Sequence, residues 1–149
     1  QAQRDEYLVA QWGAKGDKHR FFFDMMKELV QTTGMGVDPY IKMRENMHRG
    51  VSWWRPELTS QEDLNDIAAA TQAVFEYCVV NLAAWTKIRT FSPNLALAGG
   101  GALNRQAVAL LTEWDSVHVP QNPGDPGSCI GAVLAKTRQR IKLDKQWHR

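Results

Sequence analysis

Long uncharged apolar runs are missing from this chain of 149 residues, and its charge is nearly balanced. No apolar stretch approaches the roughly 18 residues that a membrane-spanning helix needs, so we expect no membrane association. The formal net charge is only +2, which is too weak to predict binding to nucleic acid. The two cysteines, Cys78 and Cys129, fall in predicted helices without metal-like spacing, so we expect two buried free thiols and a cytoplasmic location.

Two further absences concern the start of the chain and its histidines. The chain begins at Gln1 rather than Met and has no signal-peptide pattern, so we expect a start produced by excision or processing. The four histidines contain no His-x-x-x-His pair of the kind that binds zinc or iron. His118 alternates with two valines in a presumed strand, where a structural role is favoured over a catalytic one.

The length predicts one compact domain, in which residues 1–58 form a helical and irregular segment packed on an α/β lobe of residues 59–149. In the first segment, helical spacing of apolar residues covers 20–30, and 41–47 suits a further short helix. Gly34 and Gly36 are expected to end the first helix. The Trp53-Trp54 pair in the following connection suits either a core or subunit contact, or binding of a flat ligand or sugar.

From Thr59 onward the pattern alternates between helices and strands. Thr59 and Glu62 have the spacing of a capping box, and a long amphipathic helix of about 28 residues follows, ending near 91–93. We expect a strand over 94–98, a helix over 102–113, a strand over 116–119 and a helix over 126–142. This order predicts an α/β fold with neighbouring parallel strands, whose ligands bind beyond the carboxyl ends of the strands.

The first strand ends in a run of glycines, Leu95-Ala-Leu-Ala-Gly-Gly-Gly-Ala-Leu-Asn104. Gly99, Gly100 and Gly101 remove every Cβ from the turn, so its backbone is free to take positive φ and a ligand can approach closely. Asn104 follows in the first helical turn, with an amide suited to ribose or base. The alternative is a tight turn with close helix–strand packing. Taken alone, this turn favours that structural role, although a strand, a glycine turn and a helix start are also the parts of a nucleotide site.

The second strand is followed by a polar turn, Pro123-Gly-Asp-Pro-Gly-Ser128. Gly124, Gly127 and Ser128 lie near the start of the next helix, where backbone N–H groups suit a phosphate. Asp125 before Pro126 is expected to cap that helix. A capping carboxylate stays ionised and fixed in direction, which are also properties that suit a ligand for a divalent metal.

The two turns together resemble the O-carbamoyltransferase family of nodulation and antibiotic-tailoring enzymes, which is similar to the tRNA threonylcarbamoyladenosine synthases. The likeness covers residues 59 to about 135 and departs from the family pattern at Gly101, where Val is usual. It implies an actin/sugar-kinase/Hsp70-like ATPase fold, of which this chain supplies the carboxyl-terminal lobe, with helices packed on a small, mainly parallel sheet. The family's phosphate-binding hairpin and metal-binding histidines have no match in this sequence.

The resemblance also implies an activity. Such enzymes use ATP and carbamoyl phosphate to make a carbamoyladenylate, and then pass the carbamoyl group to a hydroxyl of a small acceptor. It implies a role for Asp125 in holding a divalent metal, iron among the candidates, beside the adenylate phosphate once the missing lobe is present. We therefore expect the nucleotide-binding half of such an enzyme, incomplete by itself. The alternatives are a non-catalytic nucleotide-binding module, a subunit that forms homodimers or docks on a partner chain, and a kinase of the same fold superfamily.

Overall fold

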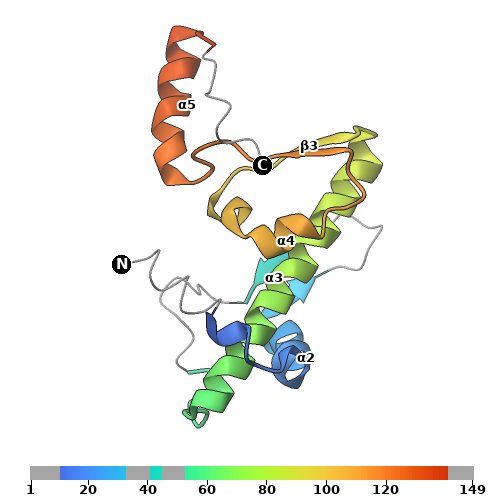
Figure 1. The fold of residues 1–149 in the computed structure, drawn as a ribbon, viewed down its shortest axis with the longest axis vertical. Coiled ribbons are helices and arrows are strands. Elements are labelled where there is room, and N and C mark those ends of the chain that lie inside the picture. Colours follow the sequence, from blue (N-terminus) through green and yellow to red (C-terminus); the bar gives the residue numbers. More distant parts are fainter. Residues whose placement is uncertain (1–10, 33–40, 45–52, 141–149) are drawn as a thin grey trace. The chain divides into compact units, whose positions relative to one another are not determined.

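The fold was analysed in a computed structural model, which describes residues 11–32, 41–44 and 53–140. These residues form a mixed α/β structure that is mostly helical and has two small two-stranded sheets (Figure 1). The chain divides into two compact units, residues 1–85 and 86–149. This boundary falls within a helix, and the division into segments 1–58 and 59–149 stays a prediction.

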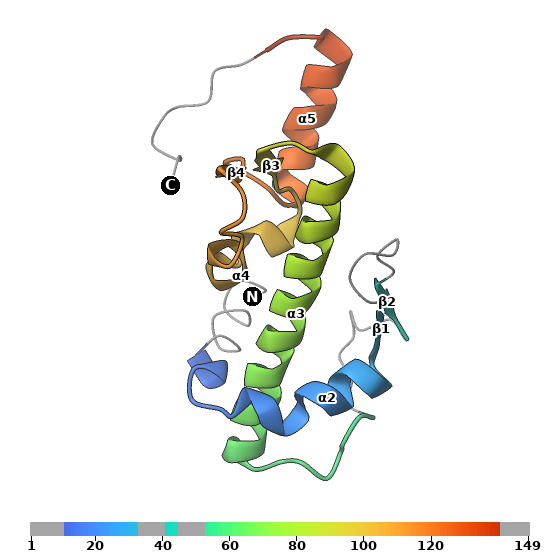
Figure 2. The ribbon, with the colours of Figure 1, turned by 90° about the vertical axis from the view of Figure 1, so that its right-hand side faces the viewer.

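The first unit is built on the contact between helices α2 (Lys18–Glu28) and α3 (Gln61–Thr90). Asp17 begins α2, because its side chain accepts a hydrogen bond from the backbone N–H of His19 at 2.8 Å. Figure 2 shows α2 lying across the amino-terminal part of α3. The core contains Phe21, Met25, Leu29, Val30, Trp54, Ala70, Val74 and Cys78. Apolar burial between the two helices therefore holds this unit together.

A short antiparallel hairpin follows α2, where helix was expected. Strands β1 (Val30–Thr32) and β2 (Ile41–Met43) pair so that Val30 lies opposite Met43. The helix predicted over 20–30 is therefore confirmed as α2 and is wrong only at its end, where Val30 begins β1. The helix predicted over 41–47 is wrong at Ile41–Met43. Val30, Thr32 and Ile41 are β-branched and fit a pleated surface better than a helix. Gly34 and Gly36, expected to end the first helix, lie outside the described residues.

Helix α3 has clear signals at both ends. Ser60 and Asp63 form the capping box, one position later than the predicted pair, with the Ser60 hydroxyl accepting from the Asp63 N–H at 3.1 Å. The Ser60 N–H in turn donates to the Asp63 carboxylate at 3.4 Å. Lys87 and Arg89 lie in the last turn and favour the helix dipole. Phe91 then takes the left-handed conformation, with φ of 52°, and Pro93 prevents the helix from resuming.

The length and composition of α3 meet the criteria for a membrane-crossing helix, so the expectation that no such stretch exists was wrong. A core helix of a soluble protein meets the same criteria. Ala70, Val74 and Cys78 of α3 are buried in the core of the first unit. Length and composition therefore do not assign this helix to a membrane.

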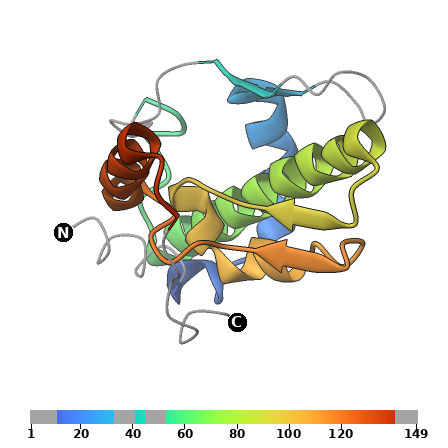
Figure 3. The same cartoon turned by 90° about the horizontal axis from the view of Figure 1, so that it is seen from above.

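The second unit contains the predicted strand–helix–strand–helix order. Strands β3 (Asn94–Ala96) and β4 (Ser116–His118) are parallel, as predicted, with Leu95 opposite Val117 (Figure 3). Between them lie the short 3₁₀ helix η2 (Gly100–Leu103) and helix α4 (Arg105–Ala109), in place of the single helix expected over 102–113. Helix α5 (Asp125–Thr137) follows and ends at Arg138 in the left-handed conformation, rather than at 142.

The structure tests the expectations for the two cysteines and for the tryptophan pair. Cys78 is buried, and burial raises the pKa of its thiol, whereas Cys129 is exposed on α5. The prediction of two buried thiols is therefore wrong for Cys129, because α5 buries none of its residues. Trp54 is a core residue whose indole N–H donates to Glu28 at 2.8 Å, while its neighbour Trp53 is half exposed.

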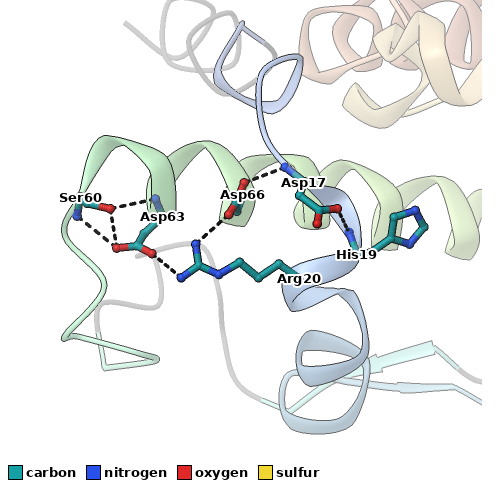
Figure 4. Close-up of polar contacts among 6 residues, drawn as sticks. All are labelled: Asp17, His19, Arg20, Ser60, Asp63 and Asp66. Atoms are coloured by element: carbon teal, nitrogen blue, oxygen red, sulfur yellow. Dashed lines mark hydrogen bonds and ion pairs between the residues drawn. The ribbon is translucent and has the colours of Figure 1, made fainter.

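One arginine ties α2 to the start of α3 (Figure 4). Arg20 contacts Asp63 at 2.7 Å and Asp66 at 2.8 Å, and the buried Asp66 also accepts from the backbone N–H of Asp17 at 2.6 Å. Hydrogen bonds from Arg20 and from the Asp17 N–H lower the pKa of Asp66. The hydroxyl of Ser60 lowers the pKa of Asp63, and Arg20 adds to this effect.

These two carboxyls make the stability of the first unit sensitive to acid. Their pKa values are lower in the folded chain than in the unfolded chain, so the stabilisation is present above about pH 4 and is lost as the pH falls through the folded values. We expect the urea midpoint to fall on acidification, and Asp66→Asn to flatten that dependence. Glu62→Gln, which changes an exposed carboxylate one turn earlier in the same helix, is the control. Identical pH profiles for Asp66→Asn and the wild type would contradict the role of Asp66.

Candidate functional site

Two glycine-containing turns leave the carboxyl ends of the parallel strands. The first glycine turn, Gly99–Gly101, follows β3, and the second glycine turn, Pro123–Gly127, follows β4. The pairing of the strands continues past their ends, because the Leu97 N–H donates to the His118 carbonyl at 2.9 Å. Since parallel strands end at the same edge, both turns begin there.

The two turns are in direct contact. The backbone N–H of Gly99 donates to the carbonyl of Pro123, with 2.5 Å between nitrogen and oxygen. A Cβ added to Gly124 would lie 3.7 Å from the Cα of Gly100. The two turns are separated by about twenty residues of sequence, which contain α4 and β4. They nevertheless form one continuous backbone surface.

Within the first glycine turn, the left-handed backbone is confined to one residue. Gly99 has φ of 95°, a conformation that side chains with a Cβ rarely adopt. An added Cβ at Gly99 or at Gly100 would meet no atom within 4 Å among the described residues. Gly100 and Gly101 are exposed and begin η2. The turn thus presents bare backbone to its surroundings, and only Gly99 needs to be glycine for conformational reasons.

Asn104 lies between η2 and α4 and begins the second of these helices. Its Oδ1 accepts a hydrogen bond from the N–H of Ala107 at 3.1 Å, which is the usual contact of an N-cap asparagine. This cap explains why the expected helix over 102–113 is split, since an N-cap residue has a non-helical backbone. The side chain is fixed beside the first glycine turn, and its contact with a nucleotide stays a prediction.

The start of α5 differs by one residue from the sequence prediction. Gly124 occupies the N-cap position, Asp125 is the first helical residue and Pro126 follows it. Asp125 is therefore not the cap, although its charge still lies where the helix dipole favours an anion. Asp125 and Ser128 are both exposed at this end of the helix. Their predicted roles toward metal and phosphate stay predictions.

Gly127 closes the second glycine turn by a close backbone approach. Its N–H donates to the carbonyl of Gly124 at 2.9 Å. A Cβ at this position would overlap the carbonyl oxygen of Asn122. Gly127 is thus required for packing within the turn, and its N–H is already engaged by the protein.

The described residues do not by themselves provide a metal site. Within 11–32, 41–44 and 53–140, no group of three His, Cys, Asp or Glu side chains is placed to hold an ion. Asp125 supplies one carboxylate, while a divalent cation takes several oxygen ligands. His48 and His148 lie outside the described ranges.

Pro123 is the residue of the site whose contact the sequence did not reveal. It is buried, and its carbonyl accepts the hydrogen bond from Gly99. A backbone carbonyl has no signature in residue type, so only the position of Pro123 within the polar turn could have drawn attention to it.

A pair of glycine substitutions on α5 tests the geometry of the second glycine turn. Gly127→Ala forces its Cβ against the Asn122 carbonyl, so we expect a cost of about 1–3 kcal/mol at the start of α5. Gly131→Ala, in open space on the same helix, should stabilise it by roughly 1 kcal/mol. Amide hydrogen exchange along α5 measures both effects. Equal protection in the two variants would show that Gly127 is not closely packed.

One of the comparisons with known proteins identifies a family. The family model described as carbamoyltransferase N-terminus matches residues 25–134, which include both glycine turns and most of the chain. No curated protein and no solved structure matches the chain. The matched range includes residues of both structural units, so the family assignment does not rest on the glycine motifs alone. The chain therefore belongs to the carbamoyltransferase N-terminus family.

Proposed function

We propose that this chain supplies the ATP-binding lobe of a carbamoyltransferase with an actin-like ATPase fold, and that the two glycine turns form its nucleotide-contacting surface. The observation that carries this proposal is the direct contact between the turns, which leaves the backbone of Gly99 and Gly100 uncovered. Membership of the carbamoyltransferase family supports the assignment to carbamoyl transfer.

Bare backbone suits an adenosine because a flat base and a ribose need close approach without intervening side chains. Several N–H groups of this region are used internally: Gly99 donates to Pro123, Ala102 to Gly99 and Asn104 to Gly101. Gly100 and Gly101 are the exposed first residues of η2, whose N–H groups have no acceptor within the helix itself. We infer that the first glycine turn contacts the nucleoside through these groups and through Asn104.

The second glycine turn suits the phosphate side of the nucleotide. Helix α5 begins there, and the positive end of its dipole lies beside the exposed hydroxyl of Ser128. Gly124 and Gly127 shape this turn, with the Gly127 N–H held by the protein itself. We infer that the two turns orient the nucleotide from both ends, which favours reaction by positioning.

The substrates follow from the family and stay part of the proposal. Carbamoyl phosphate would be the carbamoyl donor, and the acceptor would be a hydroxyl of a small molecule. Asp125 is the candidate ligand for a divalent metal beside the phosphates. Because the described residues contain no group of three side chains placed to hold an ion, we derive no chemical step through a metal. We further propose a cytoplasmic location, where ATP is present.

A non-catalytic docking module is the alternative. Helix α5 buries none of its residues, and Ile130 and Val133 are exposed at 42% and 61%. Exposed apolar side chains on one helix suit a contact with a second copy or a partner chain. Calorimetry with ATP and with AMP separates the two functions, because a module that serves only for docking has no reason to bind either nucleotide.

Substitution of Gly100 tests the nucleotide contact without straining the protein. The open space around this position accommodates a side chain, so we expect Gly100→Val to stay folded and to lose nucleotide affinity by tenfold or more, on the order of 1.4 kcal/mol. Calorimetry with AMP measures the affinity, and a urea midpoint checks the fold. Gly131→Val, also in open space, is the control. Unchanged affinity in Gly100→Val would remove the first glycine turn from the site.

Substitution of Asp125 separates metal binding from helix stability. Because Asp125 does not occupy the N-cap position, Asp125→Asn and Asp125→Ala should each cost only about 0.3–1 kcal/mol through the helix dipole. Metal-dependent formation of the carbamoyladenylate, measured as pyrophosphate release from ATP with carbamoyl phosphate in an active form of the protein, should fall in both. Asp115→Asn, an exposed carboxylate of the same unit, is the control. Normal metal-dependent activity in Asp125→Asn would leave the carboxylate without a metal role.

A further inference from the structure

We propose that the second glycine turn sets the conformation of the first, with Pro123 and Gly124 as positioning residues for the surface that meets the nucleotide. The proposal rests on the proposed function for the identity of the ligand. The coupling between the turns is a separate property, which can be measured without a nucleotide.

The hydrogen bond from Gly99 to Pro123 is the first part of this coupling. Gly99 has the left-handed φ of 95°, and its N–H is held by the buried Pro123. A residue with positive φ directs the next peptide group differently from an extended residue. The hydrogen bond to the Pro123 carbonyl therefore holds the Ala98–Gly99 peptide group, from which Gly99 leads into Gly100.

The contact between Gly124 and Gly100 is the second part. Gly124 has φ of −91° and ψ of −161°, an extended backbone that any residue can adopt. Conformation therefore gives no reason for glycine there. The reason for glycine at this position is steric, since an added Cβ would lie 3.7 Å from the Cα and 3.8 Å from the nitrogen of Gly100. One methyl group fits at these distances, and a branched side chain does not.

The second glycine turn is rigid enough to act as the reference for the first. The Gly127 N–H holds the Gly124 carbonyl, and the carbonyl of Asn122 packs against Gly127. The turn continues directly into α5, a helix of 13 residues. A displacement of Gly124 is thus resisted by its own turn, and the strain of a larger side chain falls on the first glycine turn.

A graded series at Gly124 tests the positioning role. We expect Gly124→Ala to keep the affinity for AMP within about twofold and Gly124→Val to lose tenfold or more, because only the branched side chain pushes the turns apart. Amide exchange at Gly99 should accelerate in Gly124→Val, since its hydrogen bond to Pro123 is broken, and stay normal in Gly124→Ala. The urea midpoint should change little in either variant. Gly131→Val is the matched control on the same helix.

The two readouts separate this inference from the proposed function. If the wild type binds AMP and Gly124→Val binds it equally well, the positioning role is wrong and the nucleotide site stands. If the wild type binds no nucleotide, the proposed function fails, and exchange at Gly99 alone decides the coupling. Unchanged exchange at Gly99 in Gly124→Val overturns it in either case. Gly124→Ser, with a smaller side chain in the same contact, replaces Gly124→Val if that variant does not fold.

Discussion

The hydrogen bond between the Gly99 N–H and the Pro123 carbonyl is the contact on which the candidate site depends. Each glycine turn alone is a strand-to-helix connection of a common kind. Joined by this bond and by the contact of Gly124 with Gly100, they become one surface built from two separate segments. The parallel pairing of β3 and β4 makes the bond possible, because it brings both strand ends to the same edge.

The first unit is stabilised by contacts between side chains rather than between backbone groups. Its core joins α2 and α3 through apolar contacts, and Arg20 adds a charged link to Asp63 and Asp66 at one end of the interface. Burial of apolar side chains is enough to stabilise this pair of helices without a bound ligand. The family match begins within α2 and extends into α5, so the part of the chain matched by the carbamoyltransferase N-terminus family includes residues of α2 and all of α3 as well as the glycine turns.

Several single-residue expectations failed by small shifts of position, and each shift has a local cause. The capping box is Ser60 with Asp63, because both serine and threonine at adjacent positions suit an N-cap and only the backbone decides between them. Similarly, Gly124 rather than Asp125 occupies the N-cap of α5. Ile41–Met43, where a helix was expected to begin, form a strand because Ile41 pairs with Thr32, a partner that lies nine residues earlier and that helical spacing alone does not reveal.

The sequence by itself determined the long helix α3, the order of strands and helices after it, their parallel pairing and the family. These follow from periodicity, glycine and proline positions and short-range connections, all of which are local. Only the tertiary structure decided that Pro123 holds Gly99, that Gly127 packs on Asn122 and that Cys129 is exposed. Contacts between backbone groups and the burial of a helix depend on which distant segments of the chain come into contact. The types of the individual residues do not specify these contacts directly.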